Sequence, residues 1–433
     1  MFRDFNRNAG SCLPFTLLVI LIISCCILPS TTKTISYAQE TPKYDVYDFI
    51  YVDVAMITYT NNVSEGYFEV PINYTEPHYT QFVRVFKVGG DVIINSAEND
   101  NRTIFKIPIN NNTRGYVVLN VTLTRESSKE LGIVMQALYL GNTLLYEYPY
   151  PEEIVEKYVL RPNEKVVEVV IPLFEDWMRG NLPSNLNLSM VSKTYLAVWA
   201  AKYIYGDYLI KYNASSIPRS LDEVLEKREG DCDDKSRILL NVLWYYGIPA
   251  KIQYGYVYLK FNYVADVYGS LTKFINAGPH AYVVIYVPTI GWVSVDLLAG
   301  ARLYHPTLIT GESTYSNVTS EDLEEVEKFY TSFKYLELIE IYKHNELPED
   351  LIRDLLSDSL TDRLERMFSE SPQETNTTTT SSTTYPESTT PLTTKEETTT
   401  TAVALMSSTT LLITALVIGI AILIPLLILI SRK

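Results

Sequence analysis

Three residues of this chain have side chains suited to nucleophilic chemistry, and each occupies a distinct local pattern. Cys232 lies in REGDCDDKSRILL, where a run of acidic residues meets the start of a hydrophobic helix. His280 opens the strand-like HAYVVIYV, and Asp296 follows in WVSVDLLAG. A thiolate, an imidazole that carries its proton and a carboxylate that orients the imidazole are the groups needed for acyl transfer. The sequence therefore predicts a Cys232–His280–Asp296 triad that attacks carbonyl carbon.

Cys232 has no cysteine partner in the body of the chain. The other three cysteines, Cys12, Cys25 and Cys26, lie in an apolar N-terminal segment. A solitary cysteine in an outward-facing protein is a buried hydrophobe, an intermolecular bridge or a reactive thiol. We predict that Asp231 caps the helix and Cys232 occupies its first turn, where the helix dipole and an imidazolium lower a thiol pKa. Asp231, Asp233 and Asp234 raise that pKa, but we expect pairing with His280 to outweigh them.

The meeting of His280 and Asp296 depends on the turn PTIG, residues 288–291, between their strands. With a loop of three or five residues, Asp296 lies opposite Tyr282 and diagonal to His280 on one face, within side-chain reach. With two or four residues, the two side chains lie on opposite faces. The triad therefore requires the odd loop.

Helical patterns surround Cys232. Residues 190–204 have apolar side chains at helical spacing, and Ser220 with Glu223 forms a capping box for a short helix. The helix that begins at Cys232 is expected to bury one stripe and to end at Gly247 and Pro249. The stripe comprises Ile238, Leu239, Val242, Leu243 and Tyr246. Lys235 and Ser236 are expected on its solvated flank.

Residues from about 194 to 300 resemble the core of the transglutaminase-like superfamily. The resemblance rests on SLDEVLEKREGDCDDKS, YYGIPAKIQYGYV and HAYVVIYVPTIGWVSVD in this order. It implies that Cys232 is the nucleophile, His280 the base and Asp296 the third member, in a catalytic domain at 184–310. It also implies a papain-like α+β fold, with a helix packed on an antiparallel sheet. No counterpart of the two C-terminal barrels of large animal transglutaminases follows, which makes protein cross-linking the less favoured activity.

The acidic residues beside the cysteine carry a further implication. GDCDD resembles an element of bacterial periplasmic proteases of this superfamily in which carboxylates bind calcium, so Asp231, Asp233 and Asp234 are candidate ligands. Oxygen donors suit Ca²⁺. The alternative is a solvated helix start favoured by the dipole. Acyl chemistry by the triad requires no cofactor, so calcium is an optional addition.

The flanking segments predict further units. Residues 41–135 alternate apolar and polar side chains between Asn, Gly and Pro turns, which favours a β-sandwich. A connecting segment, 136–183, contains one expected strand at 165–173. Residues 320–368 read as a helical appendage of amphipathic helices.

The two ends of the chain predict its location. Residues 1–38 read as a secretory signal peptide, with an uncleaved anchor as the alternative. Residues 369–401 are a Ser/Thr-rich stalk, and 409–430 form a transmembrane helix followed by Arg432 and Lys433. We therefore expect an ectodomain outside the cell membrane, tethered by one helix with a short cytoplasmic tail. An acidic, cysteine-poor surface protein of this kind suits an archaeal envelope.

Composition and glycosylation motifs agree with an outward-facing chain. Thirty-six basic against 51 acidic residues exclude nucleic acid as an expected partner. Nine N-x-S/T motifs predict glycosylation sites. They begin at Asn62, Asn73, Asn101, Asn111, Asn120, Asn187, Asn213, Asn317 and Asn376.

The predicted function is cleavage of peptide or glutamine-type amides in a surface protein or peptide substrate. A thioester forms on Cys232 and passes to water in a cysteine peptidase or amidase. Transfer to a second amine, which cross-links proteins, is the alternative. A third possibility, from another class, is a surface binding module without catalysis.

Overall fold

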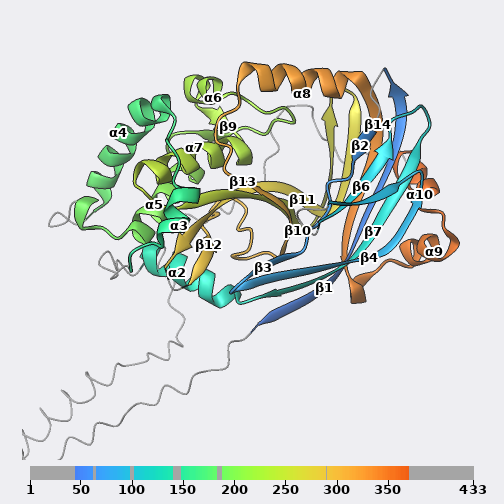
Figure 1. Ribbon diagram of the computed structural model, residues 1–433, viewed down its shortest axis with the longest axis horizontal. Helices are drawn as coiled ribbons and strands as arrows, with labels where there is room; N and C mark the ends of the chain where they lie inside the picture. Colours follow the sequence, from blue (N-terminus) through green and yellow to red (C-terminus); the bar gives the residue numbers. More distant parts are fainter. Residues whose placement is uncertain are drawn as a thin grey trace, which may run out of the picture. The chain divides into compact units, whose positions relative to one another are not determined.

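The computed structural model describes residues 44–61, 65–97, 102–139, 148–182, 188–288 and 290–369 (Figure 1). All of them belong to the first of two compact units, Met1–Thr383. The expected signal peptide and transmembrane helix, and residues 370–401 of the expected stalk, lie outside these ranges, as do Asn62, Asn101, Asn187 and Asn376. No helix within the described ranges is long and apolar enough to span a membrane.

A nine-stranded mixed sheet forms the frame, in the order β13-β10-β11-β14-β1-β7-β4-β3, with β12 paired to β11. Its strands are β1 (Asp45–Thr60), β3 (Tyr74–Glu76), β4 (Tyr79–Gly90), β7 (Arg114–Arg125), β10 (Ala250–Val267), β11 (Ser270–Val287), β12 (Gly291–Ser294), β13 (Thr307–Ser313) and β14 (Phe333–Lys343). A smaller sheet has the order β2 (Glu65–Tyr67), β6 (Arg102–Pro108), β5 (Ile93–Ala97). The short strands β8 (Lys211–Tyr212) and β9 (Glu229–Gly230) pair with each other.

The helices are α2 (Ser127–Tyr139), α3 (Glu152–Tyr158), α4 (Glu164–Asn181), α5 (Lys193–Tyr205), α6 (Leu221–Lys227), α7 (Cys232–Tyr245), α8 (Ser320–Ser332), α9 (Glu349–Ser357) and α10 (Leu360–Ser369). Two 3₁₀ turns, η1 (Leu188–Met190) and η2 (His344–Glu346), complete the described elements. Ser220 caps α6 as predicted, because its side chain accepts a hydrogen bond from the Glu223 N–H at 3.2 Å; this is one of the two hydrogen bonds of the predicted capping box.

The expectation of a separate β-sandwich at 41–135 is corrected by the sheet order. Strand β1 pairs antiparallel with β7 on one side and with β14 on the other, and β14 pairs parallel with β11. The N-terminal strands therefore continue the same sheet that carries His280. The central residues of β1, FIYVDVA, are buried without alternation, which is typical of a strand covered on both faces.

Two further expectations of secondary structure are wrong. The segment 165–173 lies in the helix α4, where Val166, Val170, Phe174 and Met178 recur every four residues on a buried stripe. KVVEVVIPL fits both periods, and the length of the stripe decides for the helix. The segment 320–368 is not wholly helical, because β14 stands between α8 and α9 and completes the sheet.

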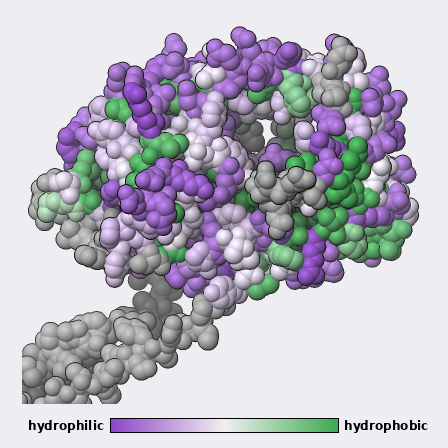
Figure 2. Space-filling view, viewed as in Figure 1, coloured by the Kyte–Doolittle hydropathy of each residue, from purple (hydrophilic) through white to green (hydrophobic). Residues whose placement is uncertain are grey.

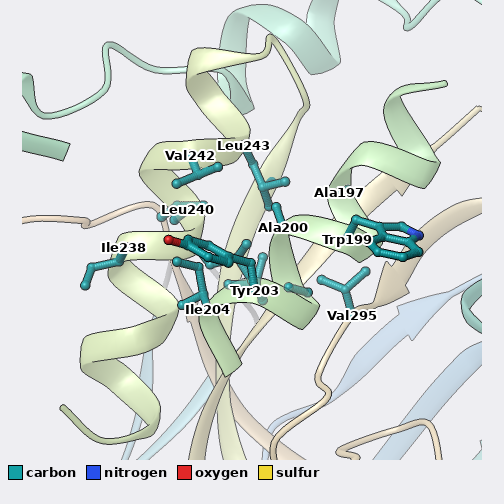
Figure 3. Packing of buried hydrophobic residues seen from close by; sticks show 14 of the residues in the cluster. Ala197, Trp199, Ala200, Tyr203, Ile204, Ile238, Leu240, Val242, Leu243 and Val295 are labelled. Atoms are coloured by element: carbon teal, nitrogen blue, oxygen red, sulfur yellow. The ribbon is translucent and has the colours of Figure 1, made fainter. Parts of the chain in front are cut away.

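The three largest of the apolar clusters among the described residues hold this frame together. One packs α5 and α7 against β11, and Figure 3 shows Ala200 and Ile204 of α5 beside Ile238 and Val242 of α7. A second lies between the large sheet and the small one and includes Phe105. A third packs α9 and α10 on the opposite face of β1. The first core confirms the expected arrangement of a helix on a sheet around Cys232.

Candidate active site

Cys232 stands at the first residue of α7, as predicted. Asp231 is the N-cap residue, and its backbone N–H donates to Asp234 Oδ2 at 3.2 Å. The first N–H groups of a helix have no acceptor within the helix, so the N–H of Cys232 is available to a ligand. The cysteine is partly buried and forms no disulfide.

Hydrogen bonds fix α7 onto β11 one turn below the thiol. The Ser236 hydroxyl donates to the carbonyl oxygen of Ala281 at 3.0 Å. The Tyr205 hydroxyl lies 2.9 Å from Ser236 Oγ and accepts from the Val283 N–H at 3.3 Å. At the thiol itself, the backbone of Ala281 lies close enough to the Cys232 sulfur for its N–H to act against the rise of the thiol pKa. The sulfur thus lies next to the residue that follows His280.

The expectation that Lys235 and Ser236 lie on a solvated flank is wrong. Both side chains are fully buried. Lys235 forms an ion pair with Asp207 and approaches the carbonyl oxygen of Tyr205 at 3.4 Å. The reason is that α7 is buried around most of its circumference. The prediction assumed that only one apolar stripe of the helix was buried, and it therefore underestimated the burial of the other side chains.

His280 and Asp296 meet through the hairpin of β11 and β12. Val287 pairs with Gly291 and Val284 with Ser294, so the loop contains three residues, which is one of the odd lengths that the triad requires. His280 Nε2 lies 2.9 Å from Asp296 Oδ2. Both side chains are buried, at 3% and 0% exposure, so water does not compete for this contact.

Asp296 is an anchored carboxylate. It accepts hydrogen bonds from the N–H groups of Leu298 at 3.0 Å, Ala299 at 3.3 Å and Ala301 at 2.7 Å. Burial raises the pKa of Asp296, but the His280 charge, its hydrogen bond and these N–H donors outweigh burial, and the pKa falls below its ordinary value. Asp296 is therefore ionised at neutral pH and holds the imidazole by Nε2.

The second ring nitrogen, His280 Nδ1, faces no hydrogen-bond partner among the described residues, and no hydrogen bond joins the imidazole to the Cys232 sulfur there. Burial, followed by the Asp231 and Asp233 carboxylates, raises the pKa of the Cys232 thiol well above its ordinary value. These contacts therefore do not support the expectation that pairing with His280 lowers the pKa of the Cys232 thiol more than the acidic residues raise it. The thiol is neutral at rest.

Arginines neutralise much of the acidic run. Asp234 accepts from Arg219 at 2.7 Å and from Arg237, and Asp233 lies 2.8 Å from Arg237. Burial and a hydrogen bond to Asp233 raise the pKa of Asp231 to about 10, so Asp231 carries a proton.

Of the three predicted calcium ligands, Asp231 and Asp233 remain next to the sulfur. Their oxygens and the Cys232 Sγ lie within 4.8 Å of one another, close enough for a cation to contact them. Asp234 points to the two guanidinium groups instead. The donor set left for a metal is therefore small and includes a thiol, which suits Ca²⁺ poorly.

Several supporting residues escaped sequence reasoning. Arg302, buried at 1% exposure, contacts Glu76 at 3.2 Å, Gln253 at 3.0 Å and Glu130, and Glu130 accepts from the Ser294 N–H at 3.2 Å. This buried network supports the loop after Asp296. The supporting role of Ser236 could have been found from the sequence, because a serine within an apolar helix indicates a buried hydrogen bond. The residues next to Arg302 in the sequence give no such indication of its burial.

His305 follows the same loop, and its carbonyl oxygen accepts a hydrogen bond from the Arg302 N–H at 3.1 Å. With Tyr47, Tyr258, Leu259, Lys260, Pro306 and Lys343 it lines an open cavity of about 290 Å³. Burial and the charge of Arg125 lower the pKa of His305.

Comparison with known proteins agrees with the geometry in this segment. Residues 188–297 match the model of the transglutaminase-like superfamily. This transglutaminase-like segment contains Cys232, His280 and Asp296. No curated protein matches the chain. A solved structure from Cytophaga hutchinsonii, provisionally described as a cysteine protease, aligns with a TM-score of 0.38 at 13% identity. The alignment covers 70% of this chain and 93% of that one, and at this score it carries no conclusion.

Proposed function

We propose that this protein is a thiol enzyme that cleaves peptide or glutamine-type amide bonds with Cys232, His280 and Asp296. The observation that carries the proposal is the buried contact of His280 Nε2 with Asp296 Oδ2 at 2.9 Å, beside a helix-start cysteine whose sulfur meets the Ala281 N–H. When Nε2 of His280 donates its hydrogen bond to Asp296, Nδ1 carries no proton and can accept one from the thiol. The transglutaminase-like segment supports the same assignment.

The reaction begins with transfer of the thiol proton to His280 Nδ1 as the sulfur attacks the amide carbonyl. Because burial and Asp233 raise the thiol pKa, proton transfer accompanies attack instead of preceding it. The N–H of Cys232 stabilises the oxyanion. His280 then protonates the departing amine, which leaves a thioester on the sulfur.

Water completes the cycle. It gives a proton to His280 and adds to the thioester carbonyl, which releases the acid and restores the thiol. Hydrolysis needs only water, whereas transfer to an amine needs a site that excludes it. We therefore favour a peptidase or amidase, with acyl transfer as the alternative. A surface binding module without catalysis is the alternative from another class.

The proposed setting is the outer face of a cell membrane, with a protein or peptide as substrate and no nucleic acid. Three predicted glycosylation residues, Asn73, Asn111 and Asn317, are exposed and support it. Two others are less suitable: Asn213 donates to Glu229 at 2.8 Å, and Asn120 has an enclosed side-chain oxygen in β7. Glycosylation is therefore proposed first at the exposed three.

Thiol labelling tests the proposal. Iodoacetamide should label Cys232 of the wild-type ectodomain faster than that of His280→Ala near neutral pH, because only the wild type has the His280 imidazole to accept the thiol proton. Cys232→Ser should take up no label at this position. Equal and slow labelling of wild type and His280→Ala would contradict a thiol enzyme and favour the binding module. A comparison of surface peptides between cells with wild type and Cys232→Ser would then identify substrates.

A further inference from the structure

A second acidic group lies on the large sheet, apart from the residues next to Cys232. Asp53 of β1 pairs with Ile339 of β14, and Ala55 pairs with Glu337, so Asp53 and Glu337 are diagonal neighbours on one face. Glu69, between β2 and β3, is exposed at the edge of this group. We call Asp53, Glu69 and Glu337 the carboxylate pocket.

The deepest member of the carboxylate pocket has an unused acceptor. Asp53 is 1% exposed, and its Oδ2 lies 3.0 Å from the Tyr51 hydroxyl. Its Oδ1 is enclosed and meets no hydrogen-bond donor within the described ranges. A buried carboxylate oxygen without a donor is unfavourable, so a donor from a ligand would stabilise it.

No positive charge compensates these carboxylates. Among the residues that the structure describes, no basic side chain forms an ion pair with Asp53, Glu69 or Glu337. Within the described ranges, the side-chain carboxylates of Glu69 and Glu337 accept hydrogen bonds from the threonine hydroxyls of Thr310 at 2.7 Å and Thr272 at 2.9 Å. Elsewhere in this fold buried carboxylates face arginine, as Glu340 faces Arg363 at 2.7 Å. Burial raises the pKa of Asp53 well above its ordinary value and the pKa of Glu337 to about 7, so protons compensate these two groups until a cation from outside the chain replaces them.

Tyrosine side chains line the same pocket. The rings of Tyr51 and Tyr256 lie 5.7 Å apart, and both hydroxyls reach the Glu69 carbonyl oxygen, at 3.0 and 3.2 Å. Tyr330 of α8 experiences the charges of Glu337 and Glu69. Figure 2 shows a hollow in the surface below α8, the helix that carries Tyr330. Aromatic faces beside carboxylates attract organic cations.

The strand β10 connects the carboxylate pocket to the thiol. Tyr254 pairs with Ala281, whose N–H meets the Cys232 sulfur, and Tyr256 follows two residues along. Two strand residues span about 7 Å. Tyr254 experiences the charges of Asp233 at the thiol and Glu69 at the pocket. A lysine or arginine side chain that extends along β10 from a carbonyl at Cys232 would run toward Glu69.

We propose that the carboxylate pocket binds the cationic side chain of the substrate residue whose carbonyl Cys232 attacks. This inference rests on the proposed function and assigns lysine or arginine at that position. An organic cation suits the pocket better than a metal ion, because the carboxylate oxygens are spread. In the described part of the chain, only Asp231, Cys232 and Asp233 bring three ligand atoms within 4.8 Å of one another.

Two peptidyl chloromethyl ketones test the assignment, identical except that one has lysine and the other norleucine next to the reactive ketone. Alkylation joins the Cys232 sulfur to the methylene carbon and releases chloride, while the thiol proton passes to His280. We expect the lysine reagent to label about tenfold faster, equivalent to one favourable charge contact. The ratio should fall toward one in Asp53→Asn and Glu69→Gln. It should persist in the control Glu226→Gln, an exposed carboxylate on α6.

Iodoacetamide separates failure of the pocket from failure of the proposed function. Equal labelling by the two ketones, with iodoacetamide labelling that still depends on His280, would overturn the pocket alone. Labelling of Cys232 that does not depend on His280 with any reagent would overturn both. Thermal unfolding of Asp53→Asn and Glu69→Gln shows that the variants are folded. Unchanged selectivity in both folded variants would also overturn the pocket.

Discussion

The Ser236 hydroxyl donates a hydrogen bond to the Ala281 carbonyl oxygen at 3.0 Å. Ser236 lies one helical turn after Cys232, and Ala281 directly follows His280. This bond joins α7, which begins with Cys232, to β11, which carries His280. Together with the Tyr205 contact to Ser236 at 2.9 Å, it sets the position of the sulfur against β11. Ser236 and Tyr205 are positioning residues in the proposed enzyme, because they touch the supporting backbone and not the reacting atoms.

Loss of the Ser236 bond should loosen this arrangement. We expect Ser236→Ala to reduce the free energy of unfolding by about 1 to 2 kcal/mol, because the buried Ala281 carbonyl loses its side-chain donor. The His280-dependent part of iodoacetamide labelling should fall as well, measured as the rate ratio of Ser236→Ala to Ser236→Ala/His280→Ala. Chemical denaturation gives the first quantity. A stability loss with an unchanged rate ratio would show that Ser236 is structural only.

Removal of the Asp296 charge tests the orientation of His280. Asp296→Asn keeps the size of the side chain but takes away the carboxylate whose Oδ2 accepts a hydrogen bond from His280 Nε2 at 2.9 Å. We expect the labelling advantage over His280→Ala to disappear, because the imidazole can then turn or exchange its tautomer. Labelling of Asp296→Asn at the wild-type rate would contradict the assigned role.

Removal of a neighbouring negative charge should have the opposite effect. Asp233 raises the thiol pKa, so Asp233→Asn should label faster with iodoacetamide at a fixed neutral pH, and its rate–pH curve should shift to lower pH. The control Glu226→Gln, on α6, should match the wild type. A slower Asp233→Asn thiol would indicate that the ion pair with Arg237 at 2.8 Å matters more for the site than the charge at the sulfur.

Calcium should have little effect on this site. Arg219 and Arg237 already face Asp234, and Arg237 faces Asp233, so much of the negative charge that would attract Ca²⁺ is compensated. We expect equal unfolding temperatures and labelling rates in millimolar calcium and in EDTA. A rise of the unfolding temperature with calcium that is absent in Asp233→Asn would instead assign a metal to the pair Asp231 and Asp233.

The hairpin of His280 and Asp296 could be predicted because it depends only on residues that are close together in the sequence. The alternation in HAYVVIYV assigns His280 to one face, and parity relates Asp296 to it for any given loop length. The structure supplies the length, three residues between Val287 and Gly291. The N-cap at Asp231 follows in the same way from neighbouring residues.

The sheet order could not be predicted, because it depends on registers between distant segments. Phe274 of β11 pairs with Ile339 of β14, and Ile50 of β1 pairs with Tyr342 of the same strand. No local pattern in FKYLELIEIYK indicates either partner, and its charges favoured an amphipathic helix. The burial of Lys235 likewise depends on Asp207, which lies on another segment.

Glu337 allows a test of the carboxylate pocket through stability alone. Burial raises the pKa of Glu337 from 4.5 to about 7, so the folded state holds a proton that the unfolded state releases between these values. Stability therefore falls as pH rises from about 4.5 through about 7. Glu337→Gln cannot lose a proton, so it should be more stable than wild type above this window, by up to about 3 kcal/mol, and similar to it below pH 4.5. Denaturation of both proteins across this range measures the difference. The opposite result would be a wild type that becomes more stable than Glu337→Gln as the pH rises from 4.5 to about 7. That result would mean that a cation within the chain compensates Glu337. The carboxylate pocket would then have no charge left to offer a substrate.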